Sequence, residues 1–264
     1  MAAKEKRNNM IEIPFETFVS PSGVSSSFHT HTCFCDGRDT PEAMVQEAIR
    51  LGCPAIGFSG HSYTAFDESY CMSKDSTQTY CEEIRRLRQV YGGQIRIFLG
   101  IEQDYFSEEP CDAYDYVIGS VHYVCKNGAY RPVDHTAACQ QAIADDWFGG
   151  DFYAFAEAYY ALVADIWRRT HCSIVGHFDL ISKFNEHHEL FDPNHPCYTA
   201  AADRALAELM PAPVVFEINT GAVSRGCRET PYPDPRILSV LQKNHVRLLH
   251  TSDCHRKENL LFGL

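Results

Sequence analysis

Short apolar runs recur along the chain, and most are followed by a polar turn and then by a segment with helical periodicity. This alternation is typical of α/β folds with parallel strands. No internal repeat, low-complexity tract or Pro/Gly/Ser-rich linker divides the chain, so we expect a single domain over residues 1–264. The runs predict seven strands, at residues 27–29, 55–59, 95–101, 116–121, 173–176, 214–219 and 246–251.

Three segments between these runs carry helix signals. Pro41 suits the first position of a helix whose apolar stripe ends before Gly52. The same apolar spacing recurs over residues 80–91 and 152–166. The stretch 126–150 is less regular and longer than most connections, so we expect a lid or substrate loop that contains a helix.

Histidine and carboxylate side chains follow most of the predicted strands. In a barrel of parallel strands all carboxyl ends meet at one face, where loops can assemble a site from distant residues. Imidazole mixed with carboxylate, without a cage of paired cysteines, is typical of a catalytic site for Zn, Mn or Fe rather than Ca. The residues at these strand ends are His29, His31, His61, Glu102, His122, His177, Asp253 and His255.

The other histidines and the cysteines show no such pattern. Cys33 and Cys35 could bind a soft metal or form a redox switch, but without a second cysteine pair we favour two free thiols beside the site. Most of the twelve cysteines are expected to be reduced, buried small hydrophobes. We assign seven histidines to the structure or the surface: His135, His171, His187, His188, His195, His245 and His250.

Composition narrows the class of protein further. The first fifteen residues lack the apolar region of a secretory signal, and no run approaches eighteen apolar residues, so we expect a cytoplasmic protein with no membrane span. The 23 Lys and Arg against 35 Asp and Glu give a net charge of −12. This charge opposes binding to nucleic acid or anionic lipid, although three bound dications would halve it.

The chain also matches the motifs of a known family, in order, over about residues 27–256. The motifs are Phe-His-Thr-His-Thr at 28–32, Asp-Gly at 36–37, Gly-Phe-Ser-Gly-His-Ser at 57–62, Gly-Ile-Glu at 100–102, Gly-Ser-Val-His at 119–122, Gly-His-Phe-Asp at 176–179 and Ser-Asp-Cys-His at 252–255. The chain therefore resembles the polymerase and histidinol phosphatase (PHP) superfamily. Ser-Val-His-Tyr at 120–123, Phe-Gly-Gly-Asp at 148–151, Glu-Ile-Asn-Thr at 217–220, Arg225 and Pro-Tyr-Pro at 231–233 resemble its histidinol-phosphate phosphatases.

The resemblance implies a distorted (β/α)7 TIM-like barrel with three divalent metal ions, Zn, Mn or Fe. It also implies hydrolysis of a small phosphomonoester, L-histidinol phosphate, in histidine biosynthesis. Many relatives have Asp where this chain has Gly60, which leaves the tuning of His61 open. By motif, the first metal would be held by His29, His31, Glu102 and Asp253, the second by Glu102, His122 and His177, and the third by Asp36, His61 and His255.

Three residues are expected to take part directly in the reaction. Glu102 has two oxygens and can bridge two metals, Asp253 can orient an attacking water, and Arg225 offers a planar donor fork to phosphate. Lys183 and Asp134 are further candidates for substrate binding. Three more residues could support the metal-binding imidazoles or satisfy buried strand ends: Asp179, Glu217 and Asn219.

Two other functions stay open at this point. The metal set alone does not choose the leaving group, so a PHP phosphoesterase acting on nucleotides, nucleic-acid ends or another small phosphomonoester is an alternative. The acidic charge and the lack of a basic stripe weaken the nucleic-acid version. A metal-binding regulatory module without turnover is the second alternative, and an assay on a generic phosphomonoester separates it from an enzyme.

Overall fold

A computed structural model describes residue 21 and residues 23–264 of the chain. The N-terminal residues in which we found no secretory signal, and the start of the predicted single domain, lie outside this described part. None of the helices that the model describes is both long and apolar enough to span a membrane.

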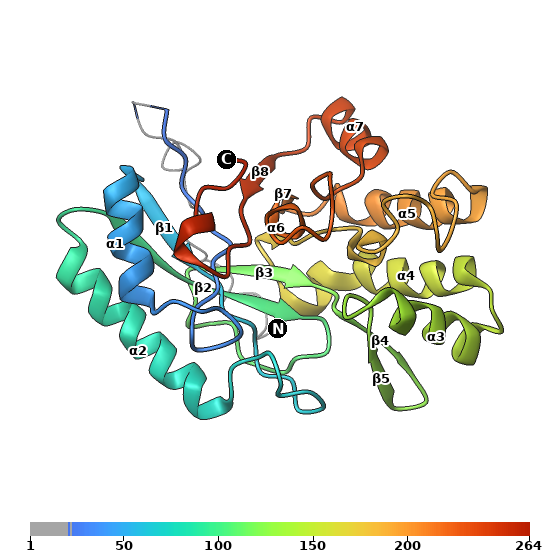
Figure 1. Cartoon of the computed structure of the whole chain (residues 1–264), viewed down its shortest axis with the longest axis horizontal. Coiled ribbons are helices and arrows are strands. Elements are labelled where there is room, and N and C mark those ends of the chain that lie inside the picture. Colours follow the sequence, from blue (N-terminus) through green and yellow to red (C-terminus); the bar gives the residue numbers. More distant parts are fainter. Residues whose placement is uncertain (1–20, 22) are drawn as a thin grey trace, which may run out of the picture.

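Six parallel strands form a curled sheet in the described chain, in the order β1-β2-β3-β6-β7-β8. Helices α1 and α2 lie together on one side of the molecule, and α3, α4 and α5 lie on the other (Figure 1). The strands span Ala55–Phe58 (β1), Arg96–Asp104 (β2), Tyr116–Ser120 (β3), Ile174–Val175 (β6), Val215–Asn219 (β7) and Leu248–Thr251 (β8). Six of the seven predicted strands are therefore confirmed, and β2 continues past its predicted end to include Glu102.

The three predicted helices are also confirmed. In α1, the Thr40 hydroxyl accepts a hydrogen bond from the amide of Ala43 at 3.2 Å, and Gly52 ends the helix in the left-handed region with φ 78°. The α-helices span Pro41–Leu51 (α1), Lys74–Tyr91 (α2), Ala137–Phe148 (α3), Phe152–Thr170 (α4), Pro196–Leu209 (α5), Gly221–Ser224 (α6) and Pro235–Lys243 (α7), with 3-10 turns at Leu180–Ser182 (η2) and Lys257–Asn259 (η3).

The run at residues 27–29 is not a regular strand, so that prediction is wrong in detail. Ser27 bridges to Ile56 of β1, and Thr30 bridges to Cys254, which follows β8. The bridge to β1 and the bridge to Cys254 start from different residues of the run, so neither extends into a continuous row of paired backbone groups. The Ser27 and Ser252 side-chain hydroxyls bond each other at 2.9 Å instead. Residues 27–31 nevertheless join the first and last strands of the curled sheet, and we call this junction the seam.

The expected loop at 126–150 contains more structure than the sequence indicated. Its helix is present as α3, but it is preceded by an antiparallel hairpin of Tyr123–Lys126 (β4) and Ala129–Pro132 (β5). Asn127 and Gly128 form the turn with φ angles of 53° and 78°, which is the geometry that Asn-Gly pairs favour in hairpins. This hairpin provides one wall of the site described below.

Inside the curled sheet, the Tyr116 ring occupies space that two glycines leave open. Its hydroxyl lies 2.6 Å from the carbonyl oxygen of Phe28 and 2.9 Å from that of Phe58. A Cβ at Gly100 would lie 2.3 Å from the Tyr116 ring, and one at Gly57 would lie 2.6 Å from its hydroxyl. Both positions therefore need glycine because the ring passes so close to the backbone.

We expect Gly100→Ala to lower the free energy of unfolding by about 2 kcal/mol, because the Tyr116 ring is held on all sides and cannot withdraw without loss of packing. Thermal unfolding monitored by circular dichroism would measure the change. Gly93→Ala is the matched control, since a Cβ there meets no atom within 4 Å. Equal melting temperatures for the two variants would contradict this account of the interior.

Candidate metal centre

The nine predicted metal ligands lie together at the carboxyl ends of the strands. Seven of them line a pocket of about 380 Å³, and the other two, His29 and His31, are buried against them. The donor atoms of eight of them form three groups in which all atoms lie within 4.8 Å of one another: His31, Asp36, His61 and His255; His29, His31 and Asp253; and His61, Glu102 and His122.

Glu102 lies at the centre of this arrangement, with each carboxylate oxygen facing a different set of imidazoles. Oε2 is 3.2 Å from His29 Nε2 and 3.0 Å from His61 Nδ1. Oε1 is 2.9 Å from His177 Nε2 and 3.4 Å from His122 Nε2. This geometry brings His177 into the centre and suits Glu102 as a bridge between two ligand sets.

The four remaining ligands, His31, Asp36, Asp253 and His255, lie close to one another. His255 Nε2 is 3.1 Å from Asp36 Oδ2, and His31 Nε2 is 3.3 Å from Asp253 Oδ1. The spatial groups differ from the motif-based ones, because His31 is grouped with Asp36 as well as Asp253 and His61 belongs to two groups. In addition, Glu102 is not grouped with His29, and His177 belongs to none of the three groups. The three ligand sets therefore share members instead of standing apart.

The electrostatics of this cluster follow from burial and from the alternation of acids and imidazoles. Burial acts to raise the pKa of Glu102, but His29, His61 and His122 hold it well below its usual range. Burial and the neighbouring His255 and His61 lower the pKa of His31 to about 3, so its ring is neutral. Despite the burial of His29, His61 and His122, the neighbouring carboxylates raise the pKa of these rings, so a cation that binds them would displace protons from them.

Two outer carboxylates fix the orientation of the imidazoles. His29 Nδ1 is 2.6 Å from Glu217 Oε1, and His122 Nδ1 is 3.2 Å from Asp104 Oδ2. An N–H donated from Nδ1 to each carboxylate leaves the opposite nitrogen, Nε2, facing Glu102, where a cation could replace its proton. Asp104 was missed at the sequence level, although it stands two residues after Glu102 in β2 and so shares its face.

The other two outer candidates behave differently. Asn219 donates to Glu217 Oε2 at 3.0 Å and lies 3.3 Å from Asp253 Oδ2, so it supports carboxylates and contacts none of the imidazoles named as ligands. Asp179 accepts a hydrogen bond from the Asp234 amide at 2.9 Å and lies apart from the described ligands. Asp179 therefore satisfies buried backbone groups, which is the second of the two roles that the sequence left open for it.

Two sulfur-containing side chains lie beside Gly60. A Cβ at this position would lie 3.1 Å from Met72 Sδ and 3.6 Å from Cys35 Sγ. Cys35 Sγ is also 3.6 Å from His31 Nδ1. Burial and Asp36 raise the pKa of Cys35 to about 12, so the group is a neutral thiol. Both Cys33 and Cys35 are free, and of the two only Cys35 has a described contact with a predicted ligand, His31.

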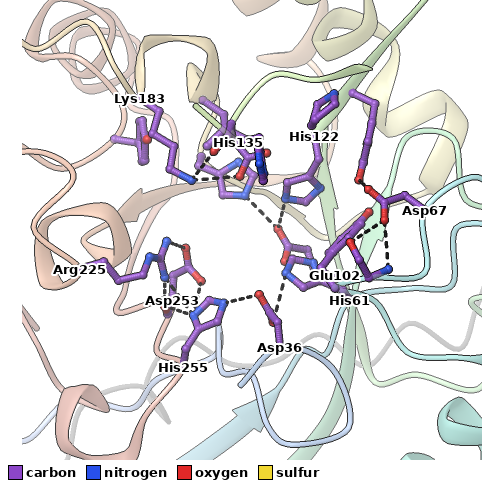
Figure 2. A pocket seen from close by; sticks show the side chains of 18 residues that line it. Asp36, His61, Asp67, Glu102, His122, His135, Lys183, Arg225, Asp253 and His255 are labelled. Carbon is purple, nitrogen blue, oxygen red and sulfur yellow. Dashed lines mark hydrogen bonds and ion pairs between the residues drawn. The ribbon is translucent and has the colours of Figure 1, made fainter. Parts of the chain in front are cut away.

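The candidate substrate residues line the same pocket. The Arg225 guanidinium contacts the Asp253 backbone oxygen at 3.0 Å, Asp253 Oδ2 at 3.2 Å and His255 Nδ1 at 2.9 Å. Lys183 Nζ is 3.1 Å from Asp134 Oδ2 and 2.8 Å from its backbone oxygen. Two cations therefore face the pocket beside the ligand cluster, and the negative charge of Asp134 is offset by Lys183 (Figure 2).

One histidine assignment needs correction. His135 was placed with the structural or surface residues, but it lines the pocket, because the β4–β5 hairpin directs the chain back toward the ligands. The lining residues that the sequence did not single out include Asp67, Ser69 and Tyr70, whereas Tyr123 and Tyr232 belong to the motifs quoted above. These residues lie on loops or at the base of the hairpin, where no helical or strand periodicity in the sequence indicates the direction of a side chain.

The donor set fits divalent metal ions. His29 Nε2, His31 Nε2 and Glu102 Oε2 are buried and have no hydrogen-bond partner, although they face one another within 3.5 Å. Buried polar atoms normally find partners, and a shared cation would satisfy all three at once. The mixture of nitrogen and carboxylate oxygen suits Zn, Mn or Fe.

Comparison with known proteins agrees with this site. Residues 27–221 match the model of the PHP domain, which is most of the described chain, and the protein belongs to the PHP domain family. It is 28% identical over 254 residues to the "Probable histidinol-phosphatase" of Schizosaccharomyces pombe, covering 88% of this chain and 80% of that protein. It is also 28% identical over 187 residues to the Bacillus subtilis histidinol-phosphatase, covering 59% and 66%.

Solved structures show the same fold. A Listeria monocytogenes protein named as a histidinol phosphatase superposes with a TM-score of 0.76 at 21% identity, covering 90% of this chain and 98% of that one. The histidinol phosphate phosphatase of Lactococcus lactis, solved with Zn, L-histidinol and phosphate, gives a TM-score of 0.59 at 20% identity, covering 88% and 86%. The fold is thus the TIM-like PHP fold, and the relatives support a phosphatase of this family.

Proposed function

We propose that this protein hydrolyses L-histidinol phosphate to L-histidinol and phosphate, as a single-domain metallophosphatase of histidine biosynthesis. The observation that carries the proposal is the cluster of nine histidine and carboxylate residues that includes Glu102 at its centre, beside two pocket cations. The names of the relatives, and the L-histidinol and phosphate bound to the Lactococcus lactis protein, support the choice of substrate.

We expect the cluster to hold three divalent ions, Zn, Mn or Fe, in ligand sets that share His31 and His61 and so depart from the motif-based sets. When bound, such ions offset the charge of phosphoryl oxygens and make water a stronger nucleophile at neutral pH. Glu102 holds two ligand sets together through its separate oxygens. Asp253, kept ionised by Arg225, His29 and His31 despite its burial, is placed to orient a water molecule.

Arg225 completes the proposed phosphate site. A guanidinium has five N–H groups, and the contacts to Asp253 and His255 use only part of them. The Arg225 side chain lines the pocket and is 33% exposed to solvent. The remaining donors can therefore reach a phosphoryl oxygen, and Lys183 brings a second positive charge to the same space.

Steady-state kinetics on metal-loaded protein test the proposal. We expect kcat/KM for L-histidinol phosphate to exceed that for p-nitrophenyl phosphate and for a nucleoside monophosphate, because only this substrate carries a cationic end as well as the phosphate. Equal or faster hydrolysis of the nucleotide would overturn the substrate and leave the phosphatase in place. Absence of turnover with every ester would favour the regulatory module.

A further inference from the structure

One wall of the pocket is built outside the ligand cluster, by residues 63–72 and the β4–β5 hairpin. Asp67 lies on this wall, across the pocket from Lys183 and Arg225 (Figure 2). Its Oδ1 accepts hydrogen bonds from the Ser69 amide at 3.0 Å and the Ser69 hydroxyl at 2.6 Å, and its Oδ2 accepts one from the Tyr123 hydroxyl at 2.6 Å. The carboxylate is therefore held in a fixed direction.

Asp67 differs from the other acids that line the pocket. Glu102, Asp36 and Asp253 face the ligand histidines, and Asp134 is paired with Lys183. Within residues 23–264, the hydrogen bonds of Asp67 come from neutral hydroxyl and amide groups, and it forms no ion pair with Lys or Arg. His135, which also lines the pocket, is the imidazole whose charge acts on the Asp67 carboxylate.

Aromatic rings connect Asp67 to the ligand cluster. The Tyr70 ring lies 4.9 Å from the His61 ring and 6.0 Å from that of Tyr123, the hydrogen-bond partner of Asp67. Behind them, Phe66 stacks on Tyr130 of β5 with a centroid distance of 3.9 Å. The loop is thus fastened to the hairpin, and the pocket gains an acid beside aromatic faces, a combination that suits an organic cation.

We propose that Asp67, with the rings of Tyr70 and Tyr123, binds the cationic end of the substrate, its ammonium or imidazolium group. The phosphate lies at the opposite end, toward the ligand cluster, Arg225 and Lys183. The pocket then has a positive end and a negative end, matched to a zwitterionic phosphomonoester. This assignment rests on the proposed function, and it makes Asp67, rather than the ion-paired Asp134, the acid that selects the leaving group.

Asp67→Asn tests the subsite, because it removes the charge and keeps the shape and an acceptor. We expect kcat/KM for L-histidinol phosphate to fall about 10- to 100-fold, the effect of losing a charge-assisted hydrogen bond, while that for p-nitrophenyl phosphate changes less than about twofold. Inhibition by L-histidinol should weaken in parallel, and inhibition by inorganic phosphate should not. Glu68→Gln is the matched control, since Glu68 is adjacent, exposed and bonded to Tyr63 instead.

Two further measurements make the result decisive. Tyr123→Phe removes one hydrogen bond and leaves the charge of Asp67, so the preference for the cationic substrate should persist. Equal losses on both substrates in Asp67→Asn would show a merely structural role and overturn the proposal, as would a selective loss in Asp134→Asn but not in Asp67→Asn. If the native protein does not prefer L-histidinol phosphate, the proposed function fails, and phosphoethanolamine, another cationic ester, still tests the subsite.

Discussion

Replacing Glu102 by Gln should remove most of the bound metal and lower phosphomonoester hydrolysis by at least about 100-fold. Outer partners of metal ligands alone are worth 10- to 100-fold, and Glu102 contacts two ligand sets directly. The amide of Gln has one carbonyl oxygen and no charge, so it cannot face both sets. Metal analysis of protein purified without chelator, together with steady-state kinetics, measures both effects.

Glu108→Gln provides the control for this change, because Glu108 is exposed and follows the same strand. It should keep native metal content and rate. Chelation of the native protein should reproduce the Glu102→Gln rate, and added Mn or Zn should restore the native protein but not the variant. Full metal content in Glu102→Gln would refute the bridge.

Truncating Arg225 to Ala should lower kcat/KM by roughly 100-fold, or about 2–3 kcal/mol, and weaken inhibition by inorganic phosphate in parallel. Arg225 also contacts Asp253 and His255, so bound metal should fall in part as well. Arg225→Lys should restore the charge but only part of the rate, because an ammonium lacks the planar fork.

The comparison for Arg225→Ala is Arg204→Ala, which removes an exposed arginine paired with Glu157. This change should leave the rate, the metal content and phosphate inhibition as they are in the native protein. An Arg225→Ala variant with native kcat/KM would place the phosphate cradle elsewhere in the pocket.

The ligand cluster could be predicted because a local pattern determines where each ligand lies. A short buried strand ends at a polar turn, and parallel strands end at one face, so His61 and His122 could be placed without knowledge of their partners. The strand at 27–29 failed because its hydrogen bonds are divided between Ile56 and Cys254, and neither contact is visible in the run itself.

The walls of the pocket were harder to predict. The Asn127-Gly128 turn is a local hairpin signal, and it could have revealed β4 and β5. Asp67 carries no comparable signal, because its role depends on Tyr123, 56 residues away in the chain. The Glu217 contact to His29 spans 188 residues, and only the folded sheet brings the two together. The subsite proposed for specificity therefore lies in the part of the pocket that sequence patterns describe least.

The seam also determines when the site can be completed on a chain synthesised from its N-terminus. His29 and His31 are synthesised before Asp253 and His255, which follow them by more than two hundred residues in the chain. Two of the three donor groups contain one of these late residues. A chain that has not yet reached residue 253 contains the group of His61, Glu102 and His122 but lacks a member of each of the other two groups. We therefore expect full metal content only after residues 253–255 have been made, once residues 27–31 have joined Cys254 and the barrel has closed.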